Sequence, residues 1–144
     1  MAHNKKFGEF FAAVVAAGNQ TITSTALVAS SINATGYDRA TFIFQMGTAS
    51  ATSAALSSGN IIYNASTSGA TYAAIAGASF GTNIAGTITN ANYVIDVNVN
   101  PSKPWLKVSA FNINTAHTYS VMCILRTPQN APPTTLSGQM VYVD

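Results

Sequence analysis

Charged side chains are scarce in this sequence. Lys and Arg together number 6 and Asp and Glu together number 4 among 144 residues, so 7% of the chain is charged, against about 25% in an ordinary soluble domain. The six basic residues form no stripe of the kind that nucleic-acid-binding proteins carry. The composition therefore predicts no nucleic-acid partner. It also predicts a neutral polar surface with little charge repulsion between copies, which favours a protein packed into an assembly.

Cysteine and histidine are also nearly absent. Cys123 is the single cysteine, so no disulfide can form within the chain, and its apolar neighbours predict a buried thiol. No two residues among the His, Cys, Asp and Glu side chains occur at the spacing of metal ligands. The four acidic residues are dispersed as well, and paired-carboxylate catalysis needs two that converge. We therefore expect no metal, no cofactor and no enzymatic activity.

Long apolar runs are missing too. None approaches the ~18 residues that a membrane span needs, so the sequence predicts no membrane partner.

The clearest strand signal lies between Gly36 and Gly47, and it organises the rest of the chain. Its side chains alternate with a period of two, which is the period of a β-strand. One face is expected to carry Ala40, Phe42, Phe44 and Met46, and the other Thr41, Ile43 and Gln45. We predict a central strand, entered through a polar corner at Asp38-Arg39.

Further short apolar segments follow one another along the chain, separated by turn residues. They are Gln20–Val28, Ile61–Tyr63, Thr71–Ala76, Thr82–Thr89, Asn92–Asn100, Trp105–Ile113, Thr118–Arg126 and Gln139–Val143. Turn signals at intervals of roughly 8–12 residues, without alternating helices, are typical of an antiparallel β-sandwich or barrel. Thr118–Arg126 is apolar on both faces, so we expect it to lie centrally and under cover. The sequence predicts an all-β protein of eight or nine short strands.

The N-terminal segment has two interpretations. Large apolar residues recur at i, i+3, i+4, i+7 and i+8, which predicts a short helix; they are Phe7, Phe10, Phe11, Val14 and Val15. Phe and Val also favour strands, so a strand over Phe10–Ala16 fits equally well. We divide the chain into an N-terminal arm, residues 1–18, and a sandwich domain, residues 19–144. Because the arm's phenylalanines need burial, Phe7, Phe10 and Phe11 are candidate interface residues.

Asp38, Arg39 and Trp105 are the remaining candidate interface residues. Neighbours on a strand point to opposite faces, so Asp38 and Arg39 are not expected to pair with each other. One of them is expected to pair across strands or with another subunit. Trp105 is the only tryptophan, and it is either a core or rim residue or an exposed aromatic that stacks on a sugar.

Two segments resemble a known family. The first is Gly36-Tyr37-Asp38-Arg39-Ala40-Thr41-Phe42, and the second runs from Tyr93 to Val99 and then through Lys103-Pro104-Trp105-Leu106-Lys107-Val108. Together they resemble small structural proteins of tailed-bacteriophage heads, which are often found beside the major capsid protein. The resemblance covers about half of the chain. Residues 48–59 depart from the family, because many relatives carry charged residues there.

The resemblance implies a jelly-roll-like sandwich and a structural role in the virion. We expect a capsid decoration or stabilising protein, made in the host cytoplasm and placed on the capsid surface. Its expected partners are the major capsid protein and further copies of itself, for example in a trimer. The alternative is a carbohydrate- or receptor-binding sandwich module of a phage fibre or tail, which would use Trp105 or tyrosines on an exposed sheet face.

Overall fold

β-strands are the regular secondary structure of the described part of the chain. The computed structural model describes residues 11–22, 29–49, 54–56, 61–80, 84–86, 91–109 and 117–128, and these contain ten strands and no helix. The all-β prediction is confirmed. The predicted strand Gln139–Val143 and the predicted contact residues Phe7 and Phe10 lie outside the described ranges.

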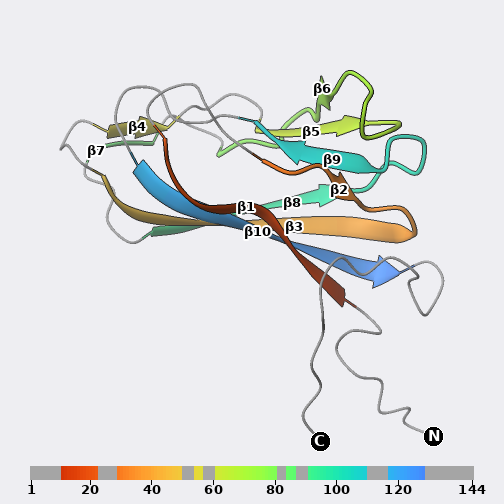
Figure 1. Ribbon diagram of the computed structural model, residues 1–144, viewed down its shortest axis with the longest axis horizontal. Helices are drawn as coiled ribbons and strands as arrows, with labels where there is room; N and C mark the ends of the chain where they lie inside the picture. Colours follow the sequence, from red (N-terminus) through yellow and green to blue (C-terminus); the bar gives the residue numbers. More distant parts are fainter. Residues whose placement is uncertain are drawn as a thin grey trace, which may run out of the picture.

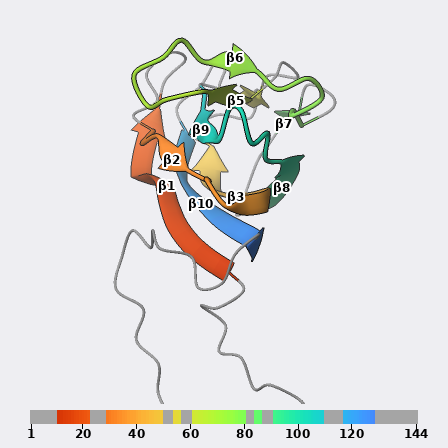
Figure 2. The ribbon, with the colours of Figure 1, turned by 90° about the vertical axis from the view of Figure 1, so that its right-hand side faces the viewer.

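Eight of the strands form two antiparallel sheets that lie face to face (Figure 1, Figure 2). Sheet 1 has the strand order β1-β10-β3-β8, and sheet 2 has the order β2-β9-β5-β6. Sheet 1 consists of β1 (Phe11–Ile22), β10 (His117–Pro128), β3 (Tyr37–Ala49) and β8 (Ala91–Asn98). Sheet 2 consists of β2 (Ile32–Asn33), β9 (Trp105–Val108), β5 (Ile62–Ala65) and β6 (Ala73–Ala74).

The chain crosses from one sheet to the other at almost every connection between these eight strands. Only β5 and β6 follow each other in sequence and also pair in the same sheet. This is the strand order of a jelly roll, and the predicted jelly-roll-like sandwich is confirmed. A separate pair, β4 (Ala54–Leu56) with β7 (Ile84–Gly86), is inserted between the sandwich strands.

The hydrophobic core lies between the sheets and is made by alternate residues of their strands. On β3, Ala40, Phe42 and Phe44 are fully buried and Met46 is 3% exposed, as the alternation predicted. Sheet 2 contributes buried side chains that include Ile32, Ile62, Leu106 and Val108. Phe80 packs against two aromatic residues of sheet 1, with ring centroids 5.3 Å from Phe44 and 5.2 Å from Tyr93. One face of each sheet is thereby used for folding.

β1 decides between the two interpretations of the N-terminal segment in favour of a strand. Phe11–Ile22 pairs antiparallel with β10, with register shifts between Val15 and Ala17 and between Ala17 and Gln20. Ala12 and Ala16 point into the core, whereas Ala13 and Val15 are exposed. Pairing with β10 outweighs the helix preference of the alanines. The expected boundary after residue 18 falls inside β1, so residues 11–18 are part of the sandwich.

β10 occupies the predicted central place but is covered on one face only. Tyr119, Val121, Cys123 and Leu125 are buried against sheet 2, whereas Met122 is 39% exposed and Ile124 is half-buried. The expectation of cover on both faces is wrong for the described residues, because sheet 2 covers just one side of sheet 1. The outer face of sheet 1 therefore carries apolar side chains that sheet 2 does not cover.

Candidate functional site

Four apolar side chains form a row across the outer face of sheet 1. Val15 of β1 lies opposite Met122 of β10, Met122 lies opposite Ile43 of β3, and Ile43 lies opposite Val94 of β8. Val15 is 62% exposed and Val94 is 61% exposed. We name these four residues the apolar row. Single exposed apolar residues are ordinary on protein surfaces, whereas this row is contiguous across four strands, which makes it a candidate interaction site.

Polar side chains border the apolar row on one side. Ser120 of β10, Gln45 of β3 and Asn92 of β8 are in register along the next row of the sheet. The Ser120 hydroxyl donates a hydrogen bond to Gln45 Oε1 at 3.2 Å. This uncharged polar border is suited to an interface rim, because it can exchange hydrogen bonds with water or with a partner.

A charged cluster borders the apolar row on the other side, with Asp96 of β8 at its centre. Arg126 Nη2 donates to Asp96 Oδ1 at 2.8 Å, and Thr41 Oγ1 donates to the same oxygen at 2.8 Å. Arg39 contacts Asp96 Oδ2 through Nη2, and also through Nε at 3.1 Å. Arg39 and Arg126 lie opposite each other on β3 and β10. The aspartate therefore holds together two side chains that would otherwise repel.

The arginines set the protonation state of Asp96. Burial raises the pKa of Asp96, but hydrogen bonds from Arg39, Arg126 and Thr41 together outweigh it and leave the pKa below its ordinary value. The carboxylate is thus ionised at neutral pH. With two arginines to one aspartate, the cluster carries a surplus positive charge next to the apolar row.

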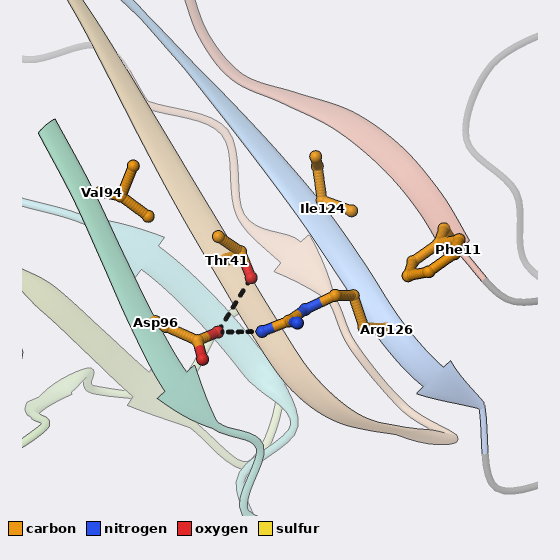
Figure 3. Close-up of a pocket in the computed structure, with 6 residues that line it drawn as sticks. All are labelled: Phe11, Thr41, Val94, Asp96, Ile124 and Arg126. Carbon is orange, nitrogen blue, oxygen red and sulfur yellow. Dashed lines mark hydrogen bonds and ion pairs between the residues drawn. The ribbon is translucent and has the colours of Figure 1, made fainter. Parts of the chain in front are cut away.

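The cluster and the end of the apolar row enclose a hollow of about 360 Å³ (Figure 3). Its lining comes from all four strands of sheet 1: Phe11, Thr41, Val94, Asp96, Ile124 and Arg126. Phe11 stands at the β1 side of this hollow, and Asp96 and Val94 stand at the β8 side. The hollow is mainly apolar, with its polar atoms already engaged in the cluster, so its chemistry favours a contacting side chain over a reacting substrate.

The structure brings together only some of the predicted interface residues. Phe11 and Arg39 lie on the outer face of sheet 1, and Arg39 pairs across strands as predicted. Asp38 is exposed at the start of β3, where its carbonyl accepts a 2.8 Å hydrogen bond from Val99 N. Trp105 is half-buried on β9, in the other sheet. The four predicted interface residues within the described ranges therefore do not form one surface, and Phe7 and Phe10 lie outside those ranges.

Asp96, Arg126 and the apolar row were not predicted as site residues. Two features of the sequence could have indicated the apolar row. Val94 breaks the alternation of Asn92–Asn100, because it places an apolar side chain among the outward polar ones. Thr118–Arg126 is apolar on both faces, and its second face is only partly buried, with Met122 39% exposed and Ile124 half-buried.

The outer face of sheet 2 is different in kind. Tyr63 of β5 lies opposite Lys107 of β9, and Lys107 Nζ lies 5.8 Å from the ring centroid of Tyr72, which is within cation–π range. With Val108 and Ser109 they line a hollow of about 230 Å³. The two tyrosines and the lysine are half-buried.

Other chemistry finds little support among the described residues. Burial raises the pKa of the Cys123 thiol to about 12, so it stays protonated and unreactive. Within residues 11–22, 29–49, 54–56, 61–80, 84–86, 91–109 and 117–128, no three His, Cys, Asp or Glu side chains gather as metal ligands. The same residues contain no helix that could span a membrane.

Comparison with protein-family models, curated proteins and solved structures finds no match to this chain. The resemblance to phage head proteins therefore rests on the two sequence segments that carry it.

Proposed function

We propose that this protein is a virion structural component, a capsid decoration or stabilising protein that binds the major capsid protein and further copies of itself. The apolar row is the observation that carries the proposal. It places exposed Val and Met side chains and a half-buried Ile in register across every strand of sheet 1. A protein neighbour that covers this face removes apolar surface from water, which drives association.

Each copy needs only a moderate contact. Full burial of a Val, Ile or Met side chain contributes about 1.5–3 kcal/mol, and the row is already partly covered in the free chain. A capsid repeats the binding site many times, and contacts between neighbouring copies then add avidity to a weak single contact. The low charge of the chain, 7%, allows copies to approach closely.

The charged cluster supplies orientation rather than most of the binding energy. Arg39 is 44% exposed and Arg126 is 36% exposed, so water screens their attraction to a partner. Complementary charges at an interface rim fix the register of two surfaces. The surplus positive charge therefore predicts an acidic residue on the capsid surface opposite the cluster.

The N-terminal segment extends the proposed contact surface. Phe11 begins β1 and lines the hollow on this face, so the segment that precedes it is covalently joined to the proposed contact surface. Deletion of residues 1–10 should weaken attachment to capsids and leave a folded sandwich. Far-UV circular dichroism and co-sedimentation measure the two results, and full attachment of the truncated chain would remove this segment from the contact.

Co-sedimentation with purified capsids tests the proposal directly. The double variant Val15→Lys/Val94→Lys places two charges in the apolar row, and attachment should fall by about tenfold or more because buried charges need partners. Ser66→Lys/Ser102→Lys is the matched control, because it adds the same two charges at exposed residues that lie outside sheet 1. Equal attachment of the double variant and the control would overturn the proposal.

A further inference from the structure

The hollow on the outer face of sheet 2 is lined by two tyrosines and a lysine that play no part in the core. Tyr63 and Lys107 are cross-strand partners on β5 and β9, and Tyr72 precedes β6. Main-chain pairing fixes Tyr63 relative to Lys107, and the Tyr72 hydroxyl donates to Ser68 O at 3.5 Å. The backbones that carry Tyr63 and Lys107 are thus fixed before any ligand arrives, which lowers part of the entropic cost of binding.

We propose that this hollow binds a sugar ring that carries a carboxylate, such as a uronic or sialic acid. Tyrosine side chains offer an apolar ring face and a polar hydroxyl, which match the apolar face and the hydroxyl groups of a pyranose. The volume of about 230 Å³ suits one ring better than a larger ligand, since drug-sized ligands occupy about 300–1,000 Å³. Ser109 adds a hydroxyl group at the wall of the hollow.

Lys107 selects for an anionic sugar. It is the single charged side chain among the described lining residues, so the site has one positive charge and no acidic group beside it. An ammonium group is a point charge that attracts a carboxylate without imposing a fixed geometry. Lys107 Nζ lies over the Tyr72 ring, 5.8 Å from its centroid, so the charge stands beside the aromatic groups that line the hollow. A sugar stacked on tyrosine can therefore direct its carboxylate towards Lys107.

A nucleic acid fits this site less well. Single-stranded nucleic acids also stack on aromatic side chains, but their binding grooves follow the phosphate backbone with several positive charges. The hollow provides one positive charge, from Lys107. An acidic monosaccharide unit carries one negative charge and therefore matches this single lysine.

The site lies on the sheet opposite the apolar row, so attachment through sheet 1 leaves it open to solvent. It does not depend on the proposed capsid role, because the isolated full chain is sufficient to bind the ligand. Repetition over an array of copies would raise the apparent affinity for a polysaccharide well above that for one sugar.

Saturation-transfer NMR on the full chain tests the site with glucuronic acid and N-acetylneuraminic acid, and with glucose and galactose as neutral comparators. At least one acidic sugar should give a signal that exceeds those of both neutral sugars. Lys107→Gln should weaken that binding by about tenfold, as expected for loss of a charge-assisted contact. Tyr72→Ala should abolish it, and Lys103→Gln should leave it unchanged, because Lys103 is exposed outside the hollow.

Three results would overturn the inference. The first is the absence of a signal from both acidic sugars. The second is equal binding by the wild type and by a folded Lys107→Gln variant. The third is equal response to acidic and neutral sugars. A parallel titration with a short oligothymidylate distinguishes a nucleotide site, and tighter binding to it than to either acidic sugar would also refute the proposal.

Discussion

The outer faces of the two sheets have the same origin, but they differ in strand length and in the side chains that they carry. Both belong to four-stranded antiparallel sheets whose inner faces make the core. Sheet 1 is built from strands of 8 to 13 residues and carries Val, Met and Ile in register. Sheet 2 is built from strands of 2 to 4 residues and carries Tyr, Lys and Trp. Long strands make an extended surface, and short strands with intervening loops make a small hollow.

This difference points to two kinds of partner. An extended apolar surface gains the most free energy from a partner of matching extent, such as the protein neighbour that we propose. A small hollow with aromatic and polar groups matches a small ligand. Jelly rolls occur in viral capsid proteins and in lectins, although a fold by itself does not assign a function. Variants on each face can separate the two roles.

The largest expected effect separates the inner from the outer face of sheet 1. Phe42 and Ile43 are neighbours on β3. Phe42 is fully buried, whereas Ile43 is half-buried and belongs to the apolar row. Phe42→Ala should lower the free energy of unfolding by about 3–5 kcal/mol, because it leaves a cavity in the core. Ile43→Ala should lower it by about 1 kcal/mol, the typical cost of a point substitution. Urea denaturation measures both, and equal losses would mean that the outer face is also part of the core.

The next largest effect is that a variant of either outer face should lose one binding activity and keep the other. Lys107→Gln should bind acidic sugar about tenfold more weakly and attach to capsids as the wild type does. Val15→Lys/Val94→Lys should attach to capsids more weakly and bind acidic sugar as the wild type does. Substitutions at well-separated sites act independently, so each cross-effect should stay within about twofold. A variant that weakens both activities would show that the faces are coupled or that the fold is damaged.

Much of the fold followed from alternation in the sequence. The inward residues of β3 were predicted because the buried face of a strand must be apolar at every second position. The N-terminal segment could not be assigned, because Phe11, Val14 and Val15 suit a helix and a strand alike. Its strand conformation depends on pairing with β10, which lies about a hundred residues away and leaves no local signal.

The sites followed from the sequence far less well. The apolar row needs the register of four strands, and register arises from long-range pairing. Asp96, Arg39 and Arg126 come from three strands that are distant in sequence, so no spacing rule could bring them together. The alternative hypothesis did anticipate tyrosines on an exposed sheet face, but without the partnership of Tyr63 and Tyr72 with Lys107.

The smallest expected effect concerns the charged cluster of Asp96, Arg39 and Arg126 on the outer face of sheet 1. Asp96→Asn leaves Arg39 and Arg126 opposed without a counter-charge, and the free energy of unfolding should fall by about 1 kcal/mol because the groups are partly exposed. The pKa of Asp96 is lowered in the folded state from its ordinary 3.8. The stabilisation is therefore complete above that value and is lost as the pH falls below it, through the folded-state pKa. Urea denaturation of both chains from pH 7 downwards should show the difference shrinking below about pH 4. Thr21→Ala, on the same sheet but outside the cluster, should show no such pH dependence, and a constant difference for Asp96→Asn would mean that its carboxylate does not stabilise the face through charge.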